Sequence, residues 1–184
     1  MSAALQLRAM AILTAPRAEW AMIASERDTV PELYIRYILP LAAIGPLALV
    51  VRFFSVGWIV LALLQYVLHL GALYVCARVI ERLAPRFKSR GDTVQALKLV
   101  AYAATPAWIA AVLNLLPALG LLVTVAVLYS VYLYYLGLPP VMGTPPEHVV
   151  PYMLVSALVI VVGFTLASAM AGVLVGGTIG VLRL

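Results

Sequence analysis

Long apolar runs separated by short polar breaks occupy most of the chain from residue 33 onward. A bilayer core about 30 Å thick needs roughly 20 apolar residues in an α-helix that crosses it. Five runs reach this length, so the sequence predicts an all-α, polytopic membrane protein with five transmembrane helices. Their expected limits are residues 33–54, 57–78, 94–116, 119–138 and 149–182.

Proline and glycine modify this simple pattern. Pro40, Gly45 and Pro46 predict that the first span is kinked, and Pro139-Pro140 with Pro145-Pro146 predict a stiff loop after the fourth span. The fifth run is longer than one span needs, so we expect a tilted helix or an irregular glycine-rich end.

Residues 1–32 form an amphipathic segment that precedes the five-helix domain of residues 33–184. Pro16 suits the first turn of a short helix, in which Trp20 and Ile23 share an apolar face while Glu19 points elsewhere. Two arrangements fit this face. The helix lies at the membrane interface with an interfacial Trp, or it packs against the cytoplasmic side of the bundle.

The composition agrees with a membrane protein. Of the 184 residues, 65% are hydrophobic and 10% are charged, whereas soluble domains average about 25% charged residues. The mean hydropathy is +1.10. This balance excludes a soluble domain, a disordered chain and a disulfide-stapled module, and the single cysteine, Cys76, has no internal disulfide partner.

The charges predict the orientation. The net charge is +5, and Lys and Arg gather in the N-terminal segment and between the second and third spans. The second group is Arg78, Arg82, Arg86, Lys88 and Arg90. Basic loops face the cytoplasm, so we expect a cytoplasmic N-terminus and a periplasmic C-terminus.

The basic loop is a plain topology signal or a contact for anionic lipid head groups. The sequence contains no basic stripe with interleaved aromatic residues, so it does not predict binding to nucleic acid.

Several ordered motifs resemble one family of membrane proteins. They are Ile12-Leu13, Pro16, Glu19-Trp20, Ile23 and Glu26; Tyr34, Tyr37 and Pro40; Leu83-Ala84-Pro85 and Phe87; Gln95 to Tyr102 with Thr105-Pro106 and Trp108; Tyr129, Tyr132 and Tyr135 to Pro139; and Met142, Pro145 and Glu147. This order resembles the YIP family of Rab/Ypt-interacting polytopic membrane proteins, and most closely its bacterial inner-membrane branch.

The resemblance implies five membrane helices and a cytoplasmic N-terminus. Eukaryotic members are associated with Rab GTPases and vesicle traffic, and they carry a long acidic cytosolic arm that residues 1–32 do not supply. For the bacterial branch, the resemblance implies a membrane protein without an assigned reaction.

A few polar residues inside the apolar runs are candidates for an intramembrane site. Gln65 and His69 share a helical face, and Lys98, Tyr102 and Thr105 form a stripe that ends at Pro106. Pro106 leaves the carbonyl of Tyr102 without its helical partner. These residues bind a small polar or anionic ligand, or they have structural roles. In the structural alternative, His69 is a packing residue, Lys98 snorkels to the surface and Thr105 satisfies the kink.

Two further groups concern helix packing. Tyr129 and Tyr132 lie on one face of the fourth span, where Tyr129 needs a partner such as Asn114 or Thr105; the tyrosines form a structural stripe or a ligand cage. In the fifth span, small residues recur at every fourth position and permit close approach within the chain or in a homodimer. They are Ser168, Gly172, Gly176 and Gly180.

Two functional hypotheses follow. Motifs for phosphate binding, metalloprotease and serine hydrolase chemistry are absent, and no paired carboxylates lie within the spans. We therefore expect a non-enzymatic protein with no metal and no cofactor. The first hypothesis is a scaffold that binds membrane lipids or a protein partner. The second is a small carrier or channel, in the form of a dimer, with a polar site inside the membrane.

Overall fold

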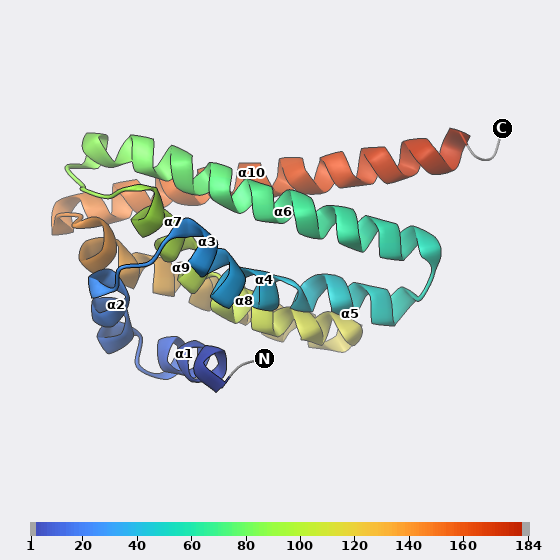
Figure 1. The fold of residues 1–184 in the computed structure, drawn as a ribbon, viewed down its shortest axis with the longest axis horizontal. Helices are drawn as coiled ribbons and strands as arrows, with labels where there is room; N and C mark the ends of the chain where they lie inside the picture. Colours follow the sequence, from blue (N-terminus) through green and yellow to red (C-terminus); the bar gives the residue numbers. More distant parts are fainter. Residues whose placement is uncertain (1–2, 182–184) are drawn as a thin grey trace.

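The computed structural model describes residues 3–181, and the described part of the chain contains helices and no strand (Figure 1). Four helical segments are long and apolar enough to cross a membrane: Val30–Phe53, Val56–Phe87, Gly120–Met142 and Pro146–Gly176. A fifth candidate is the pair Thr93–Ala103 and Thr105–Leu115, which is bent by 41°. The predicted all-α polytopic fold is confirmed with four to five helical segments able to cross a membrane, and the third segment is bent beside Pro106, where the sequence predicts a kink.

Two short helices, α1 (Ala3–Thr14) and α2 (Pro16–Ser25), precede the spans and lie at one corner of the bundle (Figure 1). Pro16 occupies the first turn of α2, where its missing N–H costs nothing. Trp20 is 0% exposed, so α2 packs against the bundle and does not present this Trp to the interface. A Cβ on Gly137 would lie 2.8 Å from the Trp20 ring and 2.7 Å from Leu99, so only glycine fits beneath the indole.

The first span is irregular, as the prolines predict. It comprises α3 (Val30–Leu33), a π-helical turn (Tyr34–Ile38), α4 (Leu39–Ala42) and α5 (Ile44–Phe53). Thr29 and Glu32 form a capping box at its start, in which each side chain binds the other residue's backbone N–H. The span ends at Phe53, and the next residue, Phe54, has a φ of 31° in the left-handed region.

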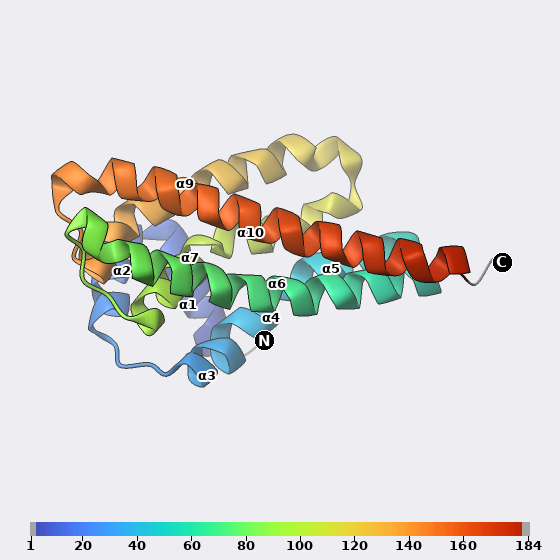
Figure 2. The same ribbon diagram turned by 90° about the horizontal axis from the view of Figure 1, so that it is seen from above.

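Helices α6 (Val56–Leu83) and α10 (Pro146–Val181) run side by side along one edge of the molecule (Figures 1 and 2). Gly163 allows this approach, because a Cβ there would lie 2.6 Å from Cys76 Sγ. At one end of the pair the Tyr152 hydroxyl donates to the Ile80 carbonyl at 2.7 Å. Polar and small residues thus hold this pair together, as expected for helices in lipid.

The third and fourth spans form the opposite layer. The third consists of α7 (Thr93–Ala103), α8 (Thr105–Ala110) and a 3₁₀ turn (Ala111–Leu115), and the fourth is α9 (Gly120–Met142). Pro139 and Pro140 lie inside α9, so the predicted loop at these residues is wrong. Membrane helices tolerate such prolines where neighbouring groups satisfy the backbone. Helix α9 continues to Met142 and is followed by Gly143, whose φ is +60°.

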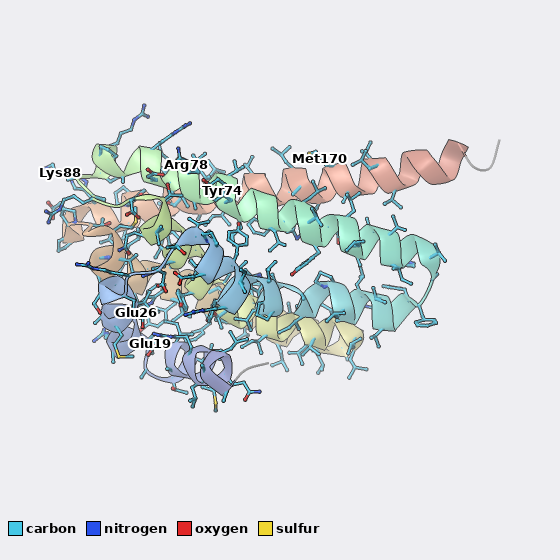
Figure 3. All side chains as sticks on the ribbon, viewed as in Figure 1. Glu19, Glu26, Tyr74, Arg78, Lys88 and Met170 are labelled. Carbon is cyan, nitrogen blue, oxygen red and sulfur yellow. The ribbon has the colours of Figure 1, made fainter. Side chains whose placement is uncertain are left out.

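The loops between α6 and α7 and between α9 and α10 meet at one end of the bundle, called the charged end below. The Arg90 N–H donates to the Met142 carbonyl at 2.7 Å, and the Ser89 hydroxyl donates to Thr144 Oγ1 at 2.8 Å. Lys88, Glu19 and Glu26 lie toward this end, away from the C-terminal half of α10 (Figure 3). The arrangement brings the N-terminal helices and the basic loop to the same side.

The contact at Gly163 gives a first prediction. Replacing Gly163 by Leu inserts a side chain between α6 and α10 and should lower the free energy of unfolding by about 1–3 kcal/mol, the usual cost of overpacking. The matched control is Gly172→Leu, because a Cβ at Gly172 meets nothing within 4 Å. Thermal unfolding in detergent measures both. An equal loss at both glycines would contradict the packing described here.

Candidate functional site

Lys98 joins the N-terminal segment to the third span. Its side chain is 0% exposed, and its ammonium lies 2.7 Å from the Asp28 carboxylate. It also donates to the carbonyls of Ile23, at 3.1 Å, and Glu26, at 2.7 Å. The structure places Lys98 neither at the surface nor in the cavity, because its ammonium is buried, pairs with Asp28 and donates to two backbone carbonyls within the chain.

A second ion cluster extends this contact between α1 and α2. Arg8 donates to Glu19 at 2.6 Å and also to Glu26. Burial alone would lower the pKa of Arg8, but its bonds to the two carboxylates raise it above the ordinary value, so Arg8 is always charged. Glu19 is only 4% exposed, whereas the sequence suggested that it pointed away from the bundle. We call Arg8, Glu19, Glu26, Asp28 and Lys98 the N-terminal clamp.

Tyr102 and Thr105 belong to the packing around this clamp. The Tyr102 ring stands edge-on to Trp20, with centroids 6.3 Å apart, and lies 4.2 Å from the Tyr37 ring. The hydroxyls of Tyr37 and Thr105 share a buried hydrogen bond of 2.7 Å. Lys98, Tyr102 and Thr105 therefore tie the first and third spans to the N-terminal segment.

The tyrosine stripe of α9 also makes structural contacts. The Tyr129 hydroxyl donates to the Leu13 carbonyl at 2.8 Å, and not to Asn114 or Thr105 as the sequence suggested. The Tyr132 ring lies 5.8 Å from the Tyr129 ring and its side chain is exposed. Tyr129 thus satisfies a carbonyl at the end of α1, a role that only the tertiary structure reveals.

A cavity of about 530 Å³ lies between the α6–α10 pair and the layer formed by α5, α8 and α9. Helices α9 and α10 are close at the charged end, where they are joined, and diverge toward the other end (Figures 1 and 2). The bend after α7 presents small side chains to the resulting space. They are Ala103, Ala104, Ala107 and Ala111.

The intramembrane cavity has mainly apolar walls and few polar groups. Three predicted candidates, Gln65, His69 and Asn114, line it. The sequence interpretation did not assign Tyr66, Ser130 or Tyr134 to the site, although they line the cavity as well. Little in the sequence indicates that these three residues line a cavity, because isolated residues with hydroxyl groups are common in membrane helices. The described residues that line the cavity include no Asp, Glu, Lys or Arg.

Several of these polar groups are already engaged. His69 Nε2 and Ser168 Oγ share a hydrogen bond of 2.9 Å. The Tyr66 hydroxyl donates to the Leu39 carbonyl at 2.9 Å, and the Ala107 N–H donates to Ser130 Oγ at 3.3 Å. Because these groups have partners and the described lining carries no charged side chain, the space suits an apolar chain better than an ion.

The small residues that recur along α10 have different surroundings. Ser168 faces α6 through its bond to His69. A Cβ at Gly172 or Gly176 would meet nothing within 4 Å, so these two glycines make no close helix contact in the described structure. Gly180 lies in α10, and its surroundings fall outside the described residues.

Within residues 3–181, no group of three or more His, Cys, Asp or Glu residues is arranged to hold a metal ion. The carboxylates of the N-terminal clamp instead bind Arg8 and Lys98.

Comparisons with known proteins add a family context. Residues 10–181 match the family model described as the Yip1 domain. The chain is 27% identical over 151 residues to the inner membrane protein YohC of Escherichia coli strain K12, an alignment that covers 72% of this chain and 77% of the relative. The YohC protein of E. coli O6:H1 matches with the same identity and coverage. No solved structure gives a significant match.

The N-terminal clamp gives a second prediction. Replacing Lys98 by Met leaves Asp28 and two carbonyls without their cation, and should lower the free energy of unfolding by about 3–5 kcal/mol, the cost of breaking a buried ion pair. Thermal unfolding in detergent measures this loss. Lys88→Met is the matched control, because Lys88 is exposed and should change stability by less than about 0.5 kcal/mol.

Proposed function

The chain belongs to the Yip1 domain family, and we propose that it is a non-enzymatic inner-membrane protein that binds membrane lipid in its intramembrane cavity. The observation that carries this proposal is the cavity itself, with about 530 Å³ lined mainly by apolar side chains from helices α4 to α10. Pockets for single small ligands span roughly 300–1,000 Å³ and have mostly apolar walls. Lipid acyl chains are the apolar ligands that surround such a cavity in a membrane.

The outer face of the N-terminal helices supports a role in lipid contact. Leu7 is 68% exposed, Met10 63% and Met22 52%, although the same two helices bury Trp20 and Ile12. A helix with a buried face and an exposed apolar face at the end of a bundle lies at the boundary of head groups and acyl chains. The segment therefore supports a scaffold that recruits lipids or a membrane partner.

The inner-membrane location and the orientation follow from different observations. The relative YohC is named as an inner membrane protein. The basic loop, including exposed Arg82, Arg86 and Arg90, lies at the charged end with the N-terminal helices. Positive loops favour the cytoplasmic side, which supports the proposal of a cytoplasmic N-terminus and a periplasmic C-terminus.

A small carrier or channel is the second candidate function. Gln65, His69 and Asn114 support it, because they bring polar groups to the cavity wall. The absence of charged side chains among the described lining residues favours lipid over an ion or a charged solute. A carrier of this size would need a second copy of the chain.

Lipid binding predicts a difference between two phenylalanine variants. Ala157 lines the cavity, whereas the neighbouring Leu158 is 63% exposed on the outer surface. Ala157→Phe should fill the cavity and remove most of the lipid that remains bound after purification in detergent, and Leu158→Phe should not. Native mass spectrometry measures the bound lipid. Equal retention by both variants, each with unchanged helicity, would refute lipid binding in the cavity.

The orientation can be tested by labelling cysteines in intact cells. In a Cys76→Ala background, Phe54→Cys should react with a membrane-impermeant maleimide, because Phe54 is 84% exposed in the turn opposite the charged end. Arg86→Cys should react only after the cells are lysed. Labelling of Arg86→Cys in intact cells would reverse the proposed orientation.

A further inference from the structure

Arg52 lies beside the cavity, at the end opposite the charged end. It follows the cavity-lining residue Leu49 by three positions on α5, so both lie on neighbouring turns of one helical face. Its Nη1 donates to the backbone carbonyl of Asn114, another lining residue, at 2.8 Å. Arg52 therefore connects the two walls of the cavity at this end.

The guanidinium of Arg52 has unused binding capacity. The side chain is exposed, and no ion pair joins it to an acidic residue in the described structure. A guanidinium has five N–H donors, and the bond to Asn114 uses one nitrogen. Arg52 also lies over the Phe53 ring, 4.9 Å from its centroid, which fixes the side chain without neutralising its charge.

The position of Arg52 is unusual among the charged residues. The other charged side chains within residues 3–181 belong to the N-terminal segment, to the beginnings of the first, third and fifth spans, or to residues 78–92. Arg52 alone of these residues lies near the turn between the first and second spans. Beside it, Phe53 stacks on Trp58 with centroids 4.1 Å apart, and aromatic residues of this kind mark the head-group level of a bilayer.

We propose that Arg52 and the cavity together form a site for one anionic phospholipid, with an acyl chain in the cavity and the phosphate on Arg52. The proposal rests on lipid binding in the cavity, as proposed above, and adds the class of head group. Charge complementarity supports it, because a guanidinium binds phosphate oxygens through paired donors. The site would select a lipid, whereas an apolar cavity alone would accept any acyl chain.

An alternative role for Arg52 is purely structural. It lies in the last turn of α5, where a cation interacts favourably with the helix dipole. In that case Arg52 would affect stability in the same way with every lipid. The experiment must therefore separate lipid selectivity from stability.

The test compares lipid binding by the full chain in detergent, measured by native mass spectrometry during titration with phosphatidylglycerol or phosphatidylcholine. The variants are Arg52→Gln, Arg52→Lys and, as a matched control at the charged end, exposed Arg82→Gln. Wild type should prefer phosphatidylglycerol. Arg52→Gln should weaken phosphatidylglycerol binding about tenfold or more, the effect of losing a charge-assisted hydrogen bond. It should weaken phosphatidylcholine binding less, because the choline ammonium already offsets the charge of the phosphate that both lipids carry.

Arg52→Lys keeps the charge and should retain part of the preference, and Arg82→Gln should retain all of it. Thermal unfolding without added lipid identifies any variant that is misfolded. An unchanged preference in folded Arg52→Gln, or an equal loss for both lipids, would overturn the role of Arg52. A titration with oleate distinguishes a free fatty acid from a phospholipid, and stronger displacement by oleate would overturn the phospholipid assignment. Wild-type-like binding by Ala157→Phe would instead refute the cavity as the lipid site.

Discussion

The break in the third span is the constraint on which the arrangement of the other helices depends. Pro106 has no N–H to donate, and the chain bends by 41° between α7 and the segment that begins at Thr105. In a membrane, the backbone groups released by such a bend need new partners. Ser130 of α9 accepts the backbone N–H of Ala107. At the same bend, the side-chain hydroxyl of Thr105 pairs with that of Tyr37 in the first span. The bend therefore fixes two neighbouring spans and leaves the small side chains of α8 facing an open space.

The apolar pattern predicted most of the fold, because the length of each run and the position of each proline are local properties. The short helix that begins at Pro16 and the irregular first span belong to this class. Pro139 and Pro140 show the limit of local rules, since a membrane helix accommodates proline where tertiary contacts compensate. The burial of Glu19 depends on Arg8, 11 residues earlier on another helix, and no periodicity encodes such a pair.

Only part of the candidate site could be predicted from the sequence, for the same reason. Gln65 and His69 stand out because polar residues are rare in apolar runs, and both reach the cavity. Lys98 stands out equally, yet it binds Asp28, which is distant in the sequence. The walls of the cavity are mostly alanine, valine and leucine, and these residues carry no sequence signal that distinguishes a cavity from a packed core. A cavity arises from the divergence of helices, which is a property of the whole bundle.

Helix α10 runs for 36 residues from Pro146 to Val181. At a rise of 1.5 Å per residue it measures about 54 Å, well beyond the roughly 30 Å of a hydrocarbon core. Such hydrophobic mismatch is relieved by helix tilt or by local thickening of the bilayer, at a cost that depends on membrane thickness. Because α10 also forms one wall of the cavity, the thickness of the surrounding membrane acts on a helix that lines the cavity. A change in helix tilt that relieves this mismatch would therefore also change the shape of the cavity.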